Sequence, residues 1–139
     1  MATGGYLVSD AGDSTLMGRT LLRKSYLGQD AKTTGTKTIF TTAADQGQFI
    51  VVAFIVEVAS ATAISAGGTV SLGTNSTDYN NIFTGAGVQP TAAKTYSARV
   101  PGASQVTVDV STALIANLSV AATGTSGTYN YHVLGFYTG

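Results

Sequence analysis

The sequence predicts an all-β protein: an antiparallel β-sandwich of jelly-roll type, with seven or eight strands and an extended N-terminal arm. The longest apolar run, residues 49–56, consists mainly of β-branched and aromatic residues, which favour strands. Apolar and polar residues alternate in several later segments, which are separated by glycine-rich turns. Because no helical pattern is long enough for strand–helix–strand units, the strands are expected to be antiparallel.

Two parts of the chain differ in character. Residues 1–35 hold short apolar pieces interrupted by glycine, and we interpret them as an N-terminal arm with a short helix or a strand near 20–26. Residues 36–139 carry the strand pattern and form the predicted β-sandwich domain. The expected strands are 36–42, 48–59, 69–72, 95–100, 105–110, 117–122 and 128–137, with a short helical turn at 77–83 and a loop at 85–94.

The apolar run is expected to be a central strand, because it is far shorter than the roughly 20 residues that cross a bilayer. Strand alternation assigns its even-numbered residues to the core, namely Ile50, Val52, Phe54, Val56 and Val58. The odd-numbered residues make a second apolar face, which comprises Phe49, Val51, Ala53 and Ile55. A two-layer sandwich covers only one face of each sheet. We therefore expect the N-terminal arm or a neighbouring subunit to cover the second face.

The charge content is unusually low. Charged residues make up 10% of the chain, against about 25% in typical domains. The seven basic and seven acidic residues cancel, so nothing favours nucleic acid or an anionic membrane as a partner. A neutral, hydroxyl-rich surface is typical of a subunit that packs against neighbours. Five of the seven basic residues precede residue 38, and this slightly basic leader would help copies of the chain attract one another.

The residue types needed for catalysis are scarce. The chain has no cysteine and one histidine, His132, so a zinc site is excluded. No Gly-x-Ser-x-Gly elbow accompanies the histidine. Glu57 is expected near a sheet edge, solvated or paired with a lysine or arginine, and only distant acids such as Asp109 could join it in a carboxylate pair. The sequence predicts no catalytic residues, no metal, no cofactor and no enzymatic activity.

Five tyrosines offer a candidate binding surface, namely Tyr79, Tyr96, Tyr129, Tyr131 and Tyr137. Tyr129, Tyr131 and Tyr137 fall on one face of the last predicted strand. Tyrosine combines apolar area with a polar tip, so this stripe suits a carbohydrate or protein surface. Packing of the same stripe on the core, or on a neighbouring subunit, is the competing interpretation.

Residues 70–82 resemble a segment of small β-sandwich virion proteins of tailed bacteriophages. In both, a strand ends at a glycine and is followed by a small polar turn, an aromatic residue and a short helical piece. The Ser-, Thr-, Ala- and Gly-rich strands at 105–122 and 128–137 are also similar in composition to strands of those proteins. The absence of cysteine and of a secretory signal agrees with this resemblance and with folding in a host cytoplasm.

The resemblance implies a non-enzymatic capsid decoration, or cement, protein on the capsid surface of a virion. It implies a homo-oligomer, with a trimer favoured, that binds the major capsid protein and stabilises the head through many modest contacts. The alternative is a carbohydrate- or receptor-binding module of a phage tail or fibre. Candidate subunit or capsid contacts are Arg19, Arg23, Lys24, Phe49, Val51, Ile55, Tyr129, Tyr131 and Tyr137.

Overall fold

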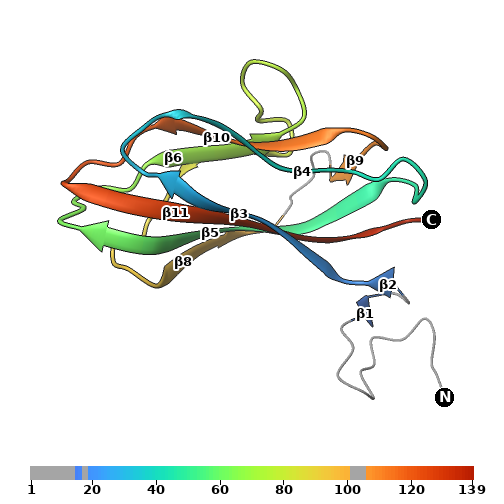
Figure 1. Ribbon diagram of the computed structural model, residues 1–139, viewed down its shortest axis with the longest axis horizontal. Coiled ribbons are helices and arrows are strands. Elements are labelled where there is room, and N and C mark those ends of the chain that lie inside the picture. Colours follow the sequence, from blue (N-terminus) through green and yellow to red (C-terminus); the bar gives the residue numbers. More distant parts are fainter. Residues whose placement is uncertain (1–14, 17–18, 101–105) are drawn as a thin grey trace.

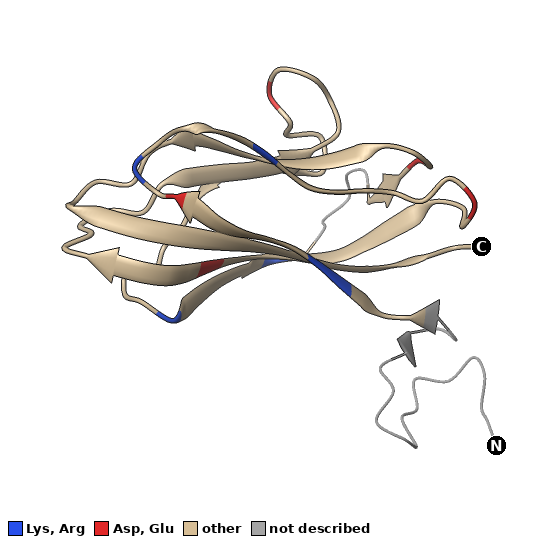
Figure 2. Cartoon of the chain, viewed as in Figure 1, with Lys and Arg blue, Asp and Glu red and all other residues tan. Residues whose placement is uncertain are grey.

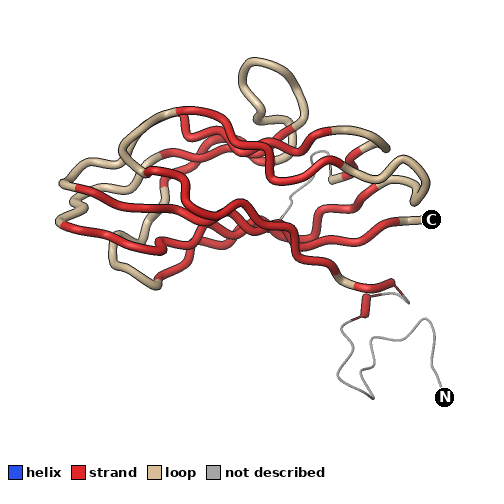
Figure 3. Tube along the Cα trace, in the orientation of Figure 1, coloured by secondary structure: helices blue, strands red, loops and turns tan. Residues whose placement is uncertain are grey.

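The protein is a β-sandwich of two antiparallel sheets, which confirms the predicted fold class (Figure 1). The computed structural model describes residues 15–16, 19–100 and 106–139, and side chains from Thr20 onward within those ranges. In the described residues the regular elements are all strands, and none is a helix that could cross a membrane. The two layers of strands face each other along the length of the molecule (Figure 3).

The larger sheet has the order β3–β11–β5–β8, and β9 also pairs with β5. The smaller sheet has the order β4–β10–β6–β7, and β1 and β2 pair with each other. The strands of the larger sheet are β3 (Leu22–Asp30), β5 (Phe49–Thr62), β8 (Thr95–Arg99), β9 (Thr107–Val108) and β11 (Ser126–Tyr137). The others are β1 (Thr15–Leu16), β2 (Arg19–Thr20), β4 (Gly35–Thr41), β6 (Thr69–Gly73), β7 (Phe83–Gly87) and β10 (Ala113–Val120).

The apolar run forms most of β5, which lies inside the larger sheet between β11 and the pair β8 and β9. Phe54, Val56 and Val58 point into the core, as the alternation predicts. The prediction is wrong before residue 54, because Phe49 and Val51 are also in the core, 0% and 2% exposed. A register shift explains the reversal: Leu134 pairs with Ala53, but the next residue of β11, Gly135, pairs with Val51.

This register shift is a β-bulge, and it places one extra residue, Val52, in β5. Gly135 allows it, because a Cβ there would lie 2.1 Å from the Ile50 carbonyl oxygen and 2.5 Å from the Phe49 ring. The bulge returns Phe49 and Val51 to the same side as Phe54. The second apolar face of β5 is therefore made by Ile50, Ala53 and Ile55, which are half-buried.

Part of the predicted arm belongs to the sandwich. Residues 22–30 form β3, which pairs along β11 from Leu22 to Asp30, so the sandwich begins well before residue 36. Residues 1–14 of the arm lie outside the described residues. Where a short helical turn was predicted at 77–83, the structure has one turn at 76–78, closed by a hydrogen bond from the Tyr79 N–H to the Asn75 carbonyl oxygen, and it does not continue. The loop predicted at 85–94 is wrong at its start, which belongs to β7.

Of the strand predicted at 105–110, residue 105 lies outside the described residues, Thr107 and Val108 form β9, and the Val106 carbonyl oxygen accepts from the Val51 N–H. Val110 is 42% exposed.

Charged residues are few and scattered along the strands and loops (Figure 2), and three of the cations contact groups at the open sides of the sandwich. On one side, Lys24 of β3 lies 5.5 Å from the Phe40 ring centroid, and Lys37 of β4 lies 5.7 Å from that of Tyr26. On the other side, the Arg99 guanidinium donates to main-chain carbonyl oxygens of the opposite sheet. Inward-pointing cations at sheet edges also discourage edge-to-edge pairing with other chains.

Candidate interaction surface

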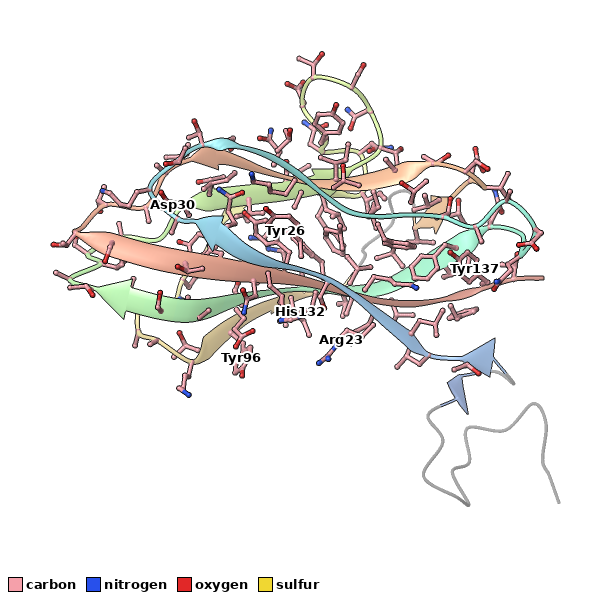
Figure 4. The ribbon with its side chains drawn as sticks, in the orientation of Figure 1. Arg23, Tyr26, Asp30, Tyr96, His132 and Tyr137 are labelled. Atoms are coloured by element: carbon pink, nitrogen blue, oxygen red, sulfur yellow. The ribbon has the colours of Figure 1, made fainter. Side chains whose placement is uncertain are left out.

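The larger sheet has one side that faces away from the smaller sheet, and we call it the outer face. In Figure 4 Arg23, Tyr96 and His132 project from this side, whereas Tyr26 and Tyr137 lie between the sheets. Strand alternation and register place the following residues on it: Arg23, Ser25 and Leu27 of β3, Ile50, Ala53, Ile55 and Glu57 of β5, Tyr96 and Ala98 of β8, and Asn130, His132, Leu134 and Phe136 of β11.

A hydrogen-bond network crosses three strands in the middle of the outer face. The Ser25 hydroxyl lies 2.7 Å from Nδ1 of His132, and Nε2 of His132 lies 2.9 Å from Oε1 of Glu57. The Asn130 side-chain amide donates to the same carboxylate oxygen over 3.1 Å. The strand register explains the grouping, since Ser25 is directly opposite His132 and Asn130 is directly opposite Glu57.

The network keeps Glu57 charged on a largely apolar face. The hydrogen bond from His132, and then that from Asn130, hold the pKa of Glu57 below its ordinary value of 4.5, although partial burial acts in the opposite direction. The side chains of His132 and Glu57 are 14% and 21% exposed, so one edge of this ion pair still faces outward. The carboxylate therefore remains available to a group that approaches the outer face.

The order hydroxyl, imidazole, carboxylate is the order found in serine hydrolases, but the surroundings differ. Acyl transfer also needs preorganised donors for the oxyanion, commonly backbone N–H groups beside the nucleophile. The N–H groups of β3 lie in the plane of the sheet, whereas the Ser25 side chain rises from it. The geometry therefore supports a cross-strand polar contact within a binding surface better than it supports a nucleophile.

Eight of the nine predicted contact residues have described side chains, and these eight divide into an outer-face group and an inward-pointing group. Arg23 is exposed and Ile55 half-buried, and both lie on the outer face. Lys24 points inward over Phe40. Arg19 belongs to β2, and its side chain lies outside the described residues. The others lie on the core side of the larger sheet, namely Phe49, Val51, Tyr129, Tyr131 and Tyr137.

The tyrosine stripe packs on the core. Tyr129 and Tyr131 are 2% and 0% exposed, so neither is accessible to a glycan or to a subunit. The Tyr129 hydroxyl accepts a hydrogen bond from the Gly68 N–H over 2.8 Å, and the half-buried Tyr137 accepts one from the Ala43 N–H over 2.9 Å. The carbohydrate-binding alternative therefore loses this stripe, whereas Tyr96 is 60% exposed.

Sequence analysis missed the grouping of Ser25 with His132 and of His132 with Glu57, which join positions 107 and 75 residues apart. Glu57 pairs with a histidine and an asparagine instead of a lysine or arginine. One signal was present: Glu57, Asn130 and His132 are polar residues at outward positions of otherwise apolar strands. Their partners could not be read without the register.

A second feature lies on the other sheet. A hollow of about 150 Å³ is lined by Ser71, Asp78, Asn80, Gly85, Asn117 and Ser119. Ligand pockets usually measure about 300–1,000 Å³ and are mostly apolar. The hollow is smaller and polar. Groups of the 74–81 turn already bond to one another around it, and the Asn117 side chain of β10 donates to the Asp78 carbonyl oxygen. It does not have the form of a small-molecule site.

Comparison with known proteins gives relatives in structure but not in sequence. No protein-family model matches the chain, and no curated protein matches its sequence. A chain in the capsid asymmetric unit of cyanophage Pam1 is similar to it, with a TM-score of 0.59 and 16% identity over 99% of both chains. A chain in the capsid of Ralstonia phage GP4 has a TM-score of 0.60 and 17% identity, over 95% of this chain and 89% of that one.

A third similar chain comes from the acid-stable capsid of the Helicobacter pylori bacteriophage KHP30, with a TM-score of 0.51 and 19% identity over 84% of this chain and 93% of that one. At these identities the likeness establishes a shared fold. The resemblance to β-sandwich virion proteins therefore holds at the level of the fold, in three phages of different hosts.

Proposed function

We propose that the chain is a non-enzymatic structural protein of a phage virion, and that it acts as a capsid decoration, or cement, protein. The observation that carries the proposal is the near-complete overlap of its fold with chains in phage capsid structures, up to 99% of both chains. The overlap covers the sandwich as a whole and is not confined to one common motif.

The surface supports a binding role for the sandwich. Charged residues are scarce, and the outer face presents apolar side chains around one small polar network. Such a surface stabilises a shell by burying area in many copies at once, so that weak individual contacts add up. In this proposal the chain assembles as a homo-oligomer, with a trimer favoured, and binds the major capsid protein on the outside of the head.

Copy number in the virion tests the proposal. Virions of the phage that carries the gene would be purified and their proteins quantified by mass spectrometry. A decoration protein is expected at a copy number comparable to that of the major capsid protein, and virions lacking it should release DNA at a lower temperature. Absence from the virion, or the few copies typical of a tail or fibre component, would overturn the proposal.

A further inference from the structure

The outer face is more apolar than is usual for a sheet that faces water. An antiparallel sheet with one solvated face normally presents polar side chains on that face. Here the two central strands present Ile50, Ile55, Leu134 and Phe136, all half-buried by their neighbours. The outer strands add large exposed groups, since Leu27 is 65% exposed and Tyr96 is 60% exposed. A surface of this kind is typical of an interaction site.

Two charged groups on this face still have bonding capacity. Both hydrogen bonds to Glu57 end on Oε1, and no described residue donates to its Oε2. Arg23 is exposed on β3, and its guanidinium makes no hydrogen bond or ion pair with the rest of the described chain. The face thus holds a free donor and a free acceptor of opposite charge.

The two groups cannot satisfy each other within one chain. Arg23 is opposite Leu134, and Glu57 is opposite Asn130, so they differ by four residues along β11 and by two strand spacings across the sheet. At about 3.4 Å per residue and 4.8 Å per strand, their backbones are about 17 Å apart. That separation exceeds the reach of both side chains together.

We propose that a second copy of this chain covers the outer face, with Arg23 of one copy paired to Glu57 of the other. The inference rests on the proposed function and names the contact through which the copies assemble. Each copy carries both groups on the same face, so a two-fold contact pairs Arg23 of each copy with Glu57 of the other.

Charge complementarity favours a copy over an unrelated partner. An acidic surface would repel Glu57, and a basic surface would repel Arg23, whereas a copy supplies a partner for each. Lys94, an exposed cation whose charge acts on Glu57 within the chain, lies in the loop before β8 and is at the rim of the face. The contact would bury the network from Ser25 to Glu57 at its centre. The hydrogen bonds that link the members of this network are already made within each copy.

A charge exchange tests the pairing. The wild-type chain is expected to form an oligomer by size-exclusion chromatography with light scattering. Arg23→Glu and Glu57→Lys should each raise the dissociation constant at least about tenfold, because each places like charges together. The double variant Arg23→Glu/Glu57→Lys restores opposite charges and should return to within about threefold of wild type. Asp45→Lys, an exposed carboxylate away from this face, is the control and should assemble normally.

A second pair of variants covers the case in which Glu57→Lys fails to fold. Leu27→Asp alters only an exposed side chain of the outer face and should weaken assembly by at least about tenfold. Val120→Asp is the matched control, because Val120 is 56% exposed on β10 of the other sheet. This substitution should leave assembly unchanged. A monomeric wild-type chain, or equal assembly by both variants, would overturn the inference. A monomer found in virions at high copy number would refute this contact and the homo-oligomer of the proposed function, while the decoration role would stand.

Discussion

The guanidinium of Arg99, on β8 of the larger sheet, donates a hydrogen bond to the carbonyl oxygen of Val70, on β6 of the smaller sheet, over 2.7 Å. Its second nitrogen donates to the Ala86 carbonyl oxygen over 2.8 Å, so one side chain ties β8 to both β6 and β7. Burial lowers the pKa of Arg99 from its ordinary value, which reflects the cost of placing a cation there. The side of the sandwich at β7 and β8 depends on this bridge.

Removal of the bridge should loosen the sandwich. Arg99→Ala is expected to lower the free energy of unfolding by about 2 kcal/mol, because it deletes two hydrogen bonds from a charged donor. The unfolding free energy of Arg99→Lys should lie between those of wild type and Arg99→Ala, because an ammonium cannot reach both carbonyl oxygens as the planar guanidinium does. Chemical denaturation measures both, with Lys94→Ala as an exposed control. Equal stability of Arg99→Ala and wild type would show that the bridge is not stabilising.

Because of the bulge in β5, two neighbouring valines differ in burial. Val51 is 2% exposed and lies in the core, whereas Val52 is the extra residue of the bulge and is only half-buried. Val51→Ala is therefore expected to cost about 2 kcal/mol of unfolding free energy, and Val52→Ala less than about 1 kcal/mol. Equilibrium denaturation compares the two substitutions, which delete the same atoms. If Val52→Ala lowered the unfolding free energy more than Val51→Ala, the result would support simple alternation along β5 and contradict the bulge.

The bulge also shows what sequence patterns could and could not supply. The alternation in 54–58 predicted the core face there because nothing interrupts the pairing with β11. The reversal at Val52 depends on Gly135, 83 positions later, where only a glycine leaves room for the Phe49 ring and the Ile50 carbonyl oxygen. A local pattern carries no information about such a distant contact.

The same limit applies to the charged residues. Lys24 was expected on the surface, but it lies over Phe40 because the edges of a sandwich must be closed and a lysine stem can cover apolar area while its charge contacts a ring. The network from Ser25 to Glu57 joins β3, β11 and β5, and strand order is not encoded in any single segment. The fold class and the positions of several strands were predictable, whereas the register that builds the outer face was not.

Two buried tyrosines should respond oppositely to loss of the hydroxyl. The Tyr129 hydroxyl accepts from the Gly68 N–H, whereas the buried Tyr131 hydroxyl has no hydrogen-bond partner among the described residues. Burial raises the pKa of both groups. Tyr129→Phe is expected to destabilise the fold by about 1–2 kcal/mol, because it leaves the Gly68 N–H unpaired.

Tyr131→Phe removes a buried polar atom and should be neutral or stabilising by up to about 1 kcal/mol. The two substitutions delete the same atom from the same strand, so each controls for the other in thermal unfolding. Destabilisation by Tyr131→Phe equal to that by Tyr129→Phe would mean that the Tyr131 hydroxyl has an acceptor or donor in solution.

Glu57 should make stability depend on pH in the acidic range. Its pKa is lower in the folded state than its ordinary value of 4.5, because His132 and Asn130 bind the carboxylate and Lys94 lies nearby. A group with a lowered folded pKa contributes stability that is complete above the unfolded pKa and is lost as the pH falls through the folded one. The contribution of Glu57 is therefore present at pH 7 and disappears below about pH 4.5.

Glu57→Gln keeps an oxygen that can accept from His132 and Asn130 but removes the charge. Denaturation curves should show this variant less stable than wild type at pH 7, with the difference shrinking as the pH falls below 4.5. Asp45→Asn, in an exposed turn, is the matched control and should stay close to wild type across the range. A difference between Glu57→Gln and wild type that is constant with pH would mean that the amide substitution acts through packing and not through the carboxylate charge.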